Sequence, residues 1–135
     1  MAAAIPIYLE TASKRTFAGA LEWPGWCRGA RDQDVAIESF IAYGPRYRKA
    51  LGRRATSLGL PKDPREVTVV ERLKGDAGTA FGVPSITPAF DRRSFDEPEA
   101  KRLTTILNAC WSAFDRVAAF RAGFKHGPSK CVQSS

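Results

Sequence analysis

The sequence contains little histidine, methionine or cysteine, and it has no long apolar run. Its 135 residues include one histidine, one methionine and three cysteines. An odd number of cysteines, at Cys27, Cys110 and Cys131, fits reduced thiols better than a disulfide framework. The apolar runs fall far short of the roughly 18 residues that a membrane span needs, and the start from Met1 to Pro6 lacks the features of a secretory signal. We therefore expect a cytoplasmic protein.

The motifs of common enzyme classes are also missing. The glycines Gly75, Gly78 and Gly82 match neither a phosphate-binding loop with its lysine nor the dinucleotide-binding fingerprint. No serine lies in the setting of a nucleophile elbow. The sequence therefore predicts a protein without catalytic residues and without a cofactor.

The residues that are present are typical of one ordinary globular domain. Hydrophobic residues make up 44% of the chain and charged residues 26%, close to the usual shares. The formal net charge is +7, from 21 lysines and arginines against 14 aspartates and glutamates. Such a positive field favours acidic partners, either nucleic acid or an acidic protein surface.

Four segments have the pattern of β-strands. Alternating or β-branched apolar residues predict strands over Ala4–Glu10, Thr16–Trp23 and Glu66–Leu73, and a short strand beginning at Trp26. Pro24–Gly25 has the composition of a type II turn, because proline fixes φ and glycine accepts the positive φ that follows. The first two strands are most simply an antiparallel hairpin.

Helical periodicity occupies two other segments. Asp32 is a suitable N-cap for an amphipathic helix, which Gly44–Pro45 is expected to end or kink before a second, basic helical piece over Tyr47–Leu58. Asp96 and Glu99 have the spacing of a capping box, and the apolar stripe that follows predicts a long helix.

These elements predict an α+β fold, with a small antiparallel sheet of three to four strands, packed helices and a long C-terminal amphipathic helix. Residues 1–74 form the strand-rich domain, 75–96 a wrapping loop, 97–122 the long helix and 123–135 a disordered tail. The apolar stripe of the long helix is wide, and exposed stripes of this kind find partners. We therefore expect a homo-oligomer that forms through this helix.

The first half of the chain resembles a known family. The segment from Phe17 to Gly29, Phe-Ala-Gly-Ala-Leu-Glu-Trp-Pro-Gly-Trp-Cys-Arg-Gly, and the helix Ala-Ile-Glu-Ser-Phe-Ile-Ala-Tyr after it resemble the HicB-like antitoxin domain. In that family a strand runs into an acidic-apolar-Pro-Gly turn, a short strand and an amphipathic helix. The resemblance covers residues 4–73 and implies a relative of the RNase H fold that lacks catalysis. It implies a non-enzymatic module that binds a protein partner, characteristically a small RNA-cleaving toxin.

The whole chain resembles uncharacterised actinobacterial proteins that join such a domain to a DinB-like helical half. The long helix would then be the first helix of a bundle whose other helices are absent. A DinB-like half holds a metal through several histidines, but this chain has only His126. A truncated DinB-like protein of unknown activity is therefore an alternative, without a metal site.

Two groups of residues are candidates for binding. The aromatic turn Trp23, Pro24, Gly25 and Trp26 is a candidate partner-binding patch, although burial is favoured for its tryptophans because large aromatic side chains usually contribute buried area. The alternative is a nucleic-acid interface in which Tyr43 and Tyr47 stack on bases. Its residues are Arg46, Tyr47, Arg48, Lys49, Arg53 and Arg54. A solvated helix face explains the same stretch without a ligand.

Two smaller clusters have simpler explanations. Cys27 lies near Arg28 and Arg31, whose charges lower a thiol pKa, but burial in a strand is the favoured interpretation, because a free cysteine commonly behaves as a small hydrophobic residue. Carboxylates at the helix start supply the oxygen ligands that Mg²⁺ prefers, but helix capping and solvent exposure explain them without a metal. These carboxylates are Asp32, Asp34 and Glu38.

Overall fold

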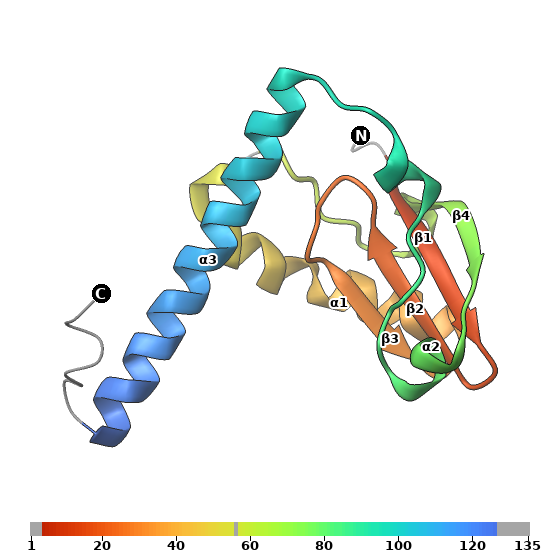
Figure 1. Ribbon diagram of the computed structural model, residues 1–135, viewed down its shortest axis with the longest axis horizontal. Coiled ribbons are helices and arrows are strands. Elements are labelled where there is room, and N and C mark those ends of the chain that lie inside the picture. The colour runs from red at the N-terminus through yellow and green to blue at the C-terminus, as the bar shows by residue number, and fades with distance from the viewer. Residues whose placement is uncertain (1–3, 56, 127–135) are drawn as a thin grey trace.

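The computed structural model describes residues 4–55 and 57–126, which form an α+β fold, as the sequence predicts (Figure 1). The strands are β1 (Ile5–Ala12), β2 (Arg15–Ala20), β3 (Cys27–Ala30) and β4 (Val67–Lys74). The α-helices are α1 (Gln33–Leu51), α2 (Ala77–Phe81) and α3 (Glu97–His126). Short 3-10 helices lie at η1 (Gly52–Ala55), η2 (Pro64–Glu66) and η3 (Ala89–Arg92).

The sheet is mixed, which corrects the antiparallel sheet expected from the sequence. Its order is β3-β2-β1-β4, with β1–β2 and β2–β3 antiparallel and β1–β4 parallel. A parallel neighbour needs a long crossover connection, and α1 lies in the connection between β3 and β4. The helix therefore allows β4 to pair with β1 in the same direction.

The main core lies between the sheet and α1. The register pairs Ile7 with Ala20 and Leu9 with Ala18, so these four side chains share the face that α1 covers. The two alanines leave room for the helix to approach, while the larger side chains of β1 fill the space beside it. Phe17 of β2 and Leu21 just after it are also buried, but they lie outside this core cluster.

Helix α1 continues through Gly44–Pro45, so the expected end of the helix there is wrong. Its buried positions continue at helical spacing on both sides of the proline, at Phe40, Gly44, Tyr47 and Leu51. Proline removes a single backbone donor, and the burial of this continuous stripe compensates for that loss. The expected second piece over Tyr47–Leu58 is thus the end of α1 followed by η1.

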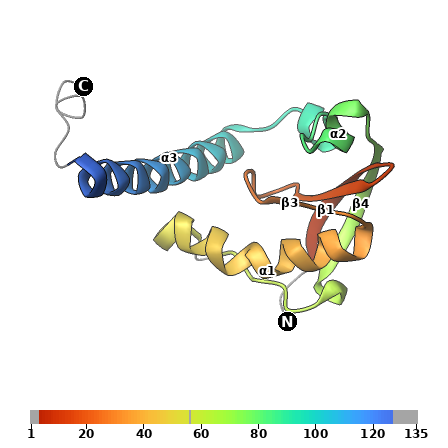
Figure 2. The same ribbon diagram turned by 90° about the horizontal axis from the view of Figure 1, so that it is seen from below.

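The connection between β4 and α3, called the covering segment here (residues 75–96), lies over the other face of the sheet (Figures 1 and 2). Two carboxylates of the sheet bind it. The fully buried carboxylate of Glu10 accepts hydrogen bonds from the hydroxyl of Thr79 at 2.6 Å and from the backbone N–H groups of Ser85 at 2.9 Å and Ile86 at 3.2 Å. Glu71 of β4 accepts a hydrogen bond from the N–H of Ala89.

Two aromatic rings on this second face lie over glycines of neighbouring strands. The ring of Tyr8 covers Gly19, and the ring of Phe17 covers Gly29. A Cβ atom at either glycine would collide with the ring above it. Both contacts therefore require the absence of a side chain.

Helix α3 begins where the sequence predicts. The Asp96 side chain accepts a hydrogen bond from the N–H of Glu99 at 3.0 Å, but the Glu99 carboxylate binds Arg93 instead of completing the capping box. The helix packs on α1 through the buried residues Ile106 and Ala109. It ends at His126, four residues beyond the expected end at 122, so the expected disordered tail begins within the helix, and the remainder of that tail lies outside the described residues.

Candidate functional site: the aromatic turn

The turn between β2 and β3 has buried tryptophans on both sides. Trp26 is 1% exposed and stacks on Phe40 of α1, with ring centroids 4.2 Å apart and planes 6° apart. Its indole N–H donates to the Phe40 carbonyl at 2.9 Å. Trp23 is also buried, and the guanidinium of Arg102 from α3 lies 5.2 Å from its ring centroid. Both tryptophans belong to the core, which leaves their rings inaccessible to a partner.

The middle of the same turn is exposed. Gly25 has φ of 94°, a conformation that glycine adopts without strain, as a type II turn requires. The hydroxyl of Tyr47 donates a hydrogen bond to the Pro24 carbonyl at 2.7 Å. Pro24 and Gly25 themselves are exposed. The turn thus presents a fixed backbone to solvent, bound to α1 through Tyr47 and to the core through its two tryptophans.

Two cavities flank this turn, and Pro24 lines both. The smaller, of about 150 Å³, is mainly apolar and lies between the turn and the start of α3, with Phe90 and Phe95 in its wall. The larger, of about 350 Å³, is more polar and includes Tyr8, Cys27 and Asp91. An approaching chain can therefore contact Pro24 and place side chains of different polarity on its two sides.

Cys27 in the larger cavity has the properties of an inert thiol. Its Sγ lies 3.7 Å from the Tyr8 hydroxyl. Burial raises the pKa of the Cys27 thiol, and the hydrogen bond to Tyr8 and the charge of Arg28 oppose this effect only in part. Burial likewise raises the pKa of the Tyr8 hydroxyl. Both groups stay protonated at neutral pH, and the thiolate that nucleophilic chemistry needs is disfavoured.

The candidate nucleic-acid residues are only partly brought together. The cations Arg46, Arg48, Lys49, Arg53 and Arg54 are exposed along the end of α1 and η1. Tyr47 is 4% exposed, so it cannot stack on a base. Tyr43 is half-buried, and the guanidiniums of Arg28 and Arg46 lie 4.7 Å and 5.9 Å from its ring centroid. Sequence reasoning missed Arg28 because the residue reaches Tyr43 only through the packing of β3 on α1.

The acidic residues at the start of α1 act as helix-terminal groups. Asp32 is the N-cap, and its side chain accepts a hydrogen bond from the N–H of Val35 at 2.9 Å. Asp34 and Glu38 are exposed. Within residues 4–55 and 57–126, no group of three or more histidine, cysteine, aspartate or glutamate side chains is arranged to hold a metal ion. None of the helices in this part of the chain is long and apolar enough to cross a membrane.

Comparisons with known proteins do not assign this site. No protein-family model, no curated protein and no solved structure matches the chain.

Proposed function

We propose that this chain is a non-enzymatic, HicB-like binding module of the cytoplasm that engages a protein partner, of the small RNA-cleaving toxin type, through the aromatic turn. The observation that carries the proposal is the rigid, exposed Pro24–Gly25 turn between two cavities. The order of elements around it supports the family resemblance, since β2 is followed by the turn, the short β3 and the amphipathic α1.

A fixed turn suits recognition because little conformational freedom is lost when a partner binds. Trp23 and Trp26 hold the turn from inside, and Tyr47 holds the Pro24 carbonyl. The apolar cavity beside Phe90 and Phe95 can accept an apolar side chain of the partner. The basic surface of α1 nearby favours an acidic patch around that contact.

The proposal is tested by capture of the partner and by substitution of the turn. The tagged chain should retain a small RNA-cleaving or RNA-binding protein from its native lysate, and the purified pair should form a complex that inhibits RNA cleavage. Pro24→Asp should weaken that complex at least about tenfold, since it places a charge at the centre of the contact. Pro64→Asp, at an exposed proline of η2, is the matched control and should leave binding unchanged. Retention of no such protein, or equal binding by Pro24→Asp, would contradict the proposal.

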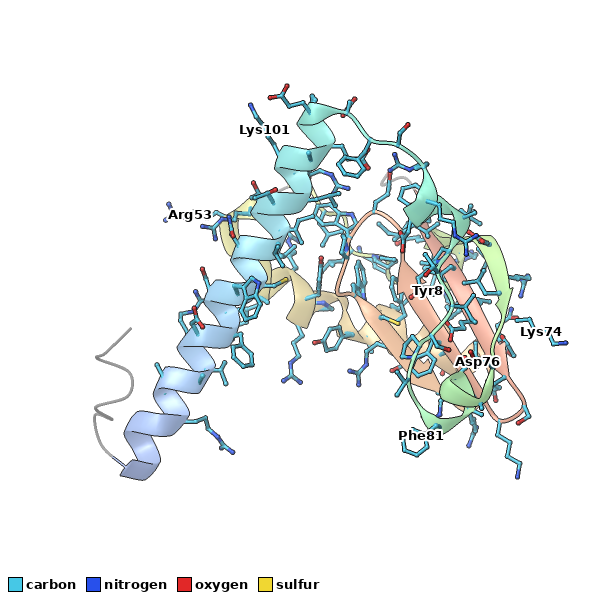
Figure 3. All side chains as sticks on the ribbon, viewed as in Figure 1. Tyr8, Arg53, Lys74, Asp76, Phe81 and Lys101 are labelled. Atoms are coloured by element: carbon cyan, nitrogen blue, oxygen red, sulfur yellow. The ribbon has the colours of Figure 1, made fainter. Side chains whose placement is uncertain are left out.

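A second candidate function, nucleic-acid binding, is favoured by the contact of Tyr43 with Arg28 and Arg46. Guanidiniums and an aromatic ring on one surface suit a single-stranded nucleic acid, because cations contact phosphates and the ring offers a face for stacking. The exposed cations along the rest of α1 and η1 extend this surface toward Arg53, on the side of the molecule where α3 lies (Figure 3).

If this second function holds, affinity for single-stranded RNA should fall steeply with salt. The double variant with Arg28→Ala and Arg46→Ala should reduce the slope of log K against log salt by about 1.4, since each lost phosphate contact contributes about 0.7. A double variant with Lys62→Ala and Lys74→Ala removes the same charge from other exposed sites and should change the slope less. Fluorescence anisotropy measures both. The absence of binding at low salt would eliminate this function.

A further inference from the structure

Helix α3 exposes a row of large apolar side chains, called the α3 stripe here. Its members are Leu107, Trp111, Phe114 and Val117, which are 55%, 57%, 64% and 63% exposed. Trp111 and Phe114 contact each other edge to face, with ring centroids 6.1 Å apart. Large apolar residues at spacings of three and four lie along one side of a helix. The helix therefore presents a continuous apolar surface to solvent.

This stripe is separate from the surface by which α3 packs on its own domain. Ile106 and Ala109 belong to the core and Cys110 packs against it. Around the helix axis, the stripe is centred roughly a quarter-turn away from these three residues. Figure 2 shows the C-terminal half of α3 extending past the end of α1 and away from the sheet. A partner helix can thus lie along the stripe without displacing any element of the domain.

The apolar area that the α3 stripe exposes is large enough to be compared with known functional patches and interfaces. From typical burial areas of such side chains, the stripe amounts to roughly 500 Å² of apolar surface on one copy. This equals a typical largest apolar patch of a monomeric protein, a patch that is often functional. Two copies that cover each other's stripes would bury about 1,000 Å², which is about the minimum area expected of a biological interface and is typical of a weak one.

We propose that the α3 stripe is covered by the α3 stripe of a second copy of this chain, in an antiparallel helix pair with twofold symmetry. Charge favours a second copy at this place. Between residues 97 and 120, α3 carries three cations and three anions, whereas the whole chain carries +7. Two copies therefore meet on a stretch without net charge, with little like-charge repulsion.

The antiparallel direction follows from the stripe and from the domains attached to it. With the twofold axis near residue 112, Leu107 lies level with Val117 of the second copy, and Trp111 lies level with Phe114. Each large side chain then meets an apolar one. In each copy, the rest of the chain packs on the first half of α3. An antiparallel pair therefore places the two positively charged domains at opposite ends, whereas a parallel pair would set them side by side.

The test of association is sedimentation velocity of the full chain over a range of concentrations. The wild type should change from 14.8 kDa to twice that mass with a midpoint of roughly micromolar concentration. Phe114→Glu should raise the dissociation constant at least about a thousandfold, because the substituted residue occurs twice in a twofold interface. Thr105→Glu adds the same charge at an exposed position on another side of α3 and should leave the constant unchanged. A monomeric wild type at high concentration, or a dimer unaffected by Phe114→Glu, overturns the proposal.

Distances between spin labels test the direction. A nitroxide attached through an encoded keto amino acid at Lys101 or Asp115 leaves the three cysteines untouched. An antiparallel pair should give a distance more than twice as long at position 101 as at position 115, roughly 35 Å against about 15 Å. A parallel pair should give similar short distances at both positions, which would refute the antiparallel arrangement.

This inference is independent of the proposed function. The stripe lies on α3, and the aromatic turn that we assign to the partner lies between β2 and β3. A monomeric chain that still retains its partner through Pro24 would overturn only the helix pair. A dimer whose turn binds nothing would overturn only the proposed function.

Discussion

Glu10→Ala is expected to lower the free energy of unfolding by about 3–5 kcal/mol, which is a large part of the 5–15 kcal/mol typical of a domain. The Glu10 carboxylate is fully buried and accepts three hydrogen bonds from the covering segment. Alanine would leave the Thr79 hydroxyl and the backbone N–H groups of Ser85 and Ile86 without this acceptor. A buried donor that is left unpaired costs on the order of 1–3 kcal/mol, and Thr79 is fully buried, whereas Ser85 and Ile86 are more exposed. Chemical denaturation followed by circular dichroism measures the change.

Two comparisons make this prediction specific. Glu71→Ala removes the other carboxylate that binds the covering segment, but Glu71 is only half-buried, and water can replace it, so the loss should stay near 1 kcal/mol. Glu10→Gln keeps one carbonyl acceptor and the shape of the side chain, and its cost should fall between the two. A Glu10→Ala variant no less stable than Glu71→Ala would show that Glu10 does not hold the segment.

Trp26→Ala is expected to lower the free energy of unfolding by about 3–5 kcal/mol. The Trp26 ring lies between Phe40 and Tyr47, with centroid distances of 4.2 Å and 5.5 Å, and α1 packs on the sheet through this stack. Alanine would leave a cavity that the surrounding rings fill only in part. Loss of the ring would also release one side of the aromatic turn.

The matched control is Trp111→Ala, the same substitution at the exposed tryptophan of α3. In dilute solution, below the concentration at which copies associate, it should cost less than about 1 kcal/mol, because Trp111 is 57% exposed. Trp26→Phe keeps an aromatic ring but loses the hydrogen bond to the Phe40 carbonyl, with an expected cost of about 1–2 kcal/mol. Circular dichroism is the readout, since tryptophan fluorescence changes with the substitution itself. Equal costs at Trp26 and Trp111 would contradict the assignment of Trp26 to the core.

Local chemistry in the sequence predicts where most elements begin. Asp32 and Asp96 cap helices in the structure as their sequence context predicts, and Pro24–Gly25 forms the expected turn. Capping and turn formation depend on neighbouring residues, so a short window of sequence contains the whole interaction. The strands likewise lie near their expected positions, although β2 ends at Ala20 instead of Trp23.

Interactions between residues far apart in the sequence could not be predicted from local patterns. Helix α1 continues through Pro45 because Gly44 packs against Trp26 and Leu60, contacts that no local pattern contains. The spacing of Phe40, Gly44, Tyr47 and Leu51 was a usable signal, since it preserves one helical face across the proline. The parallel direction of β4 depends on the crossover connection through α1, and the sequence pattern of a single strand does not indicate its direction in the sheet.

In the candidate sites, too, local patterns are visible in the sequence, whereas burial depends on contacts between distant residues. The aromatic turn is visible in the sequence, but whether its tryptophans point inward depends on α1 and α3. Tyr43 and Tyr47 are equivalent in the sequence as residues for base stacking. Packing buries Tyr47 beneath the turn and leaves Tyr43 half-buried near the guanidiniums of Arg28 and Arg46.

The rings that lie over Gly19 and Gly29 constrain how this chain can evolve. A side chain at Gly19 becomes sterically acceptable only after Tyr8 has been replaced by a smaller residue, and Gly29 and Phe17 form a second such pair. In each pair the order of substitutions matters. Replacing the glycine first causes a steric collision, whereas replacing the aromatic residue first leaves a cavity. In homologous sequences, the aromatic residue and the glycine of each pair should therefore be substituted together. The two residues of a pair lie on neighbouring strands of the sheet.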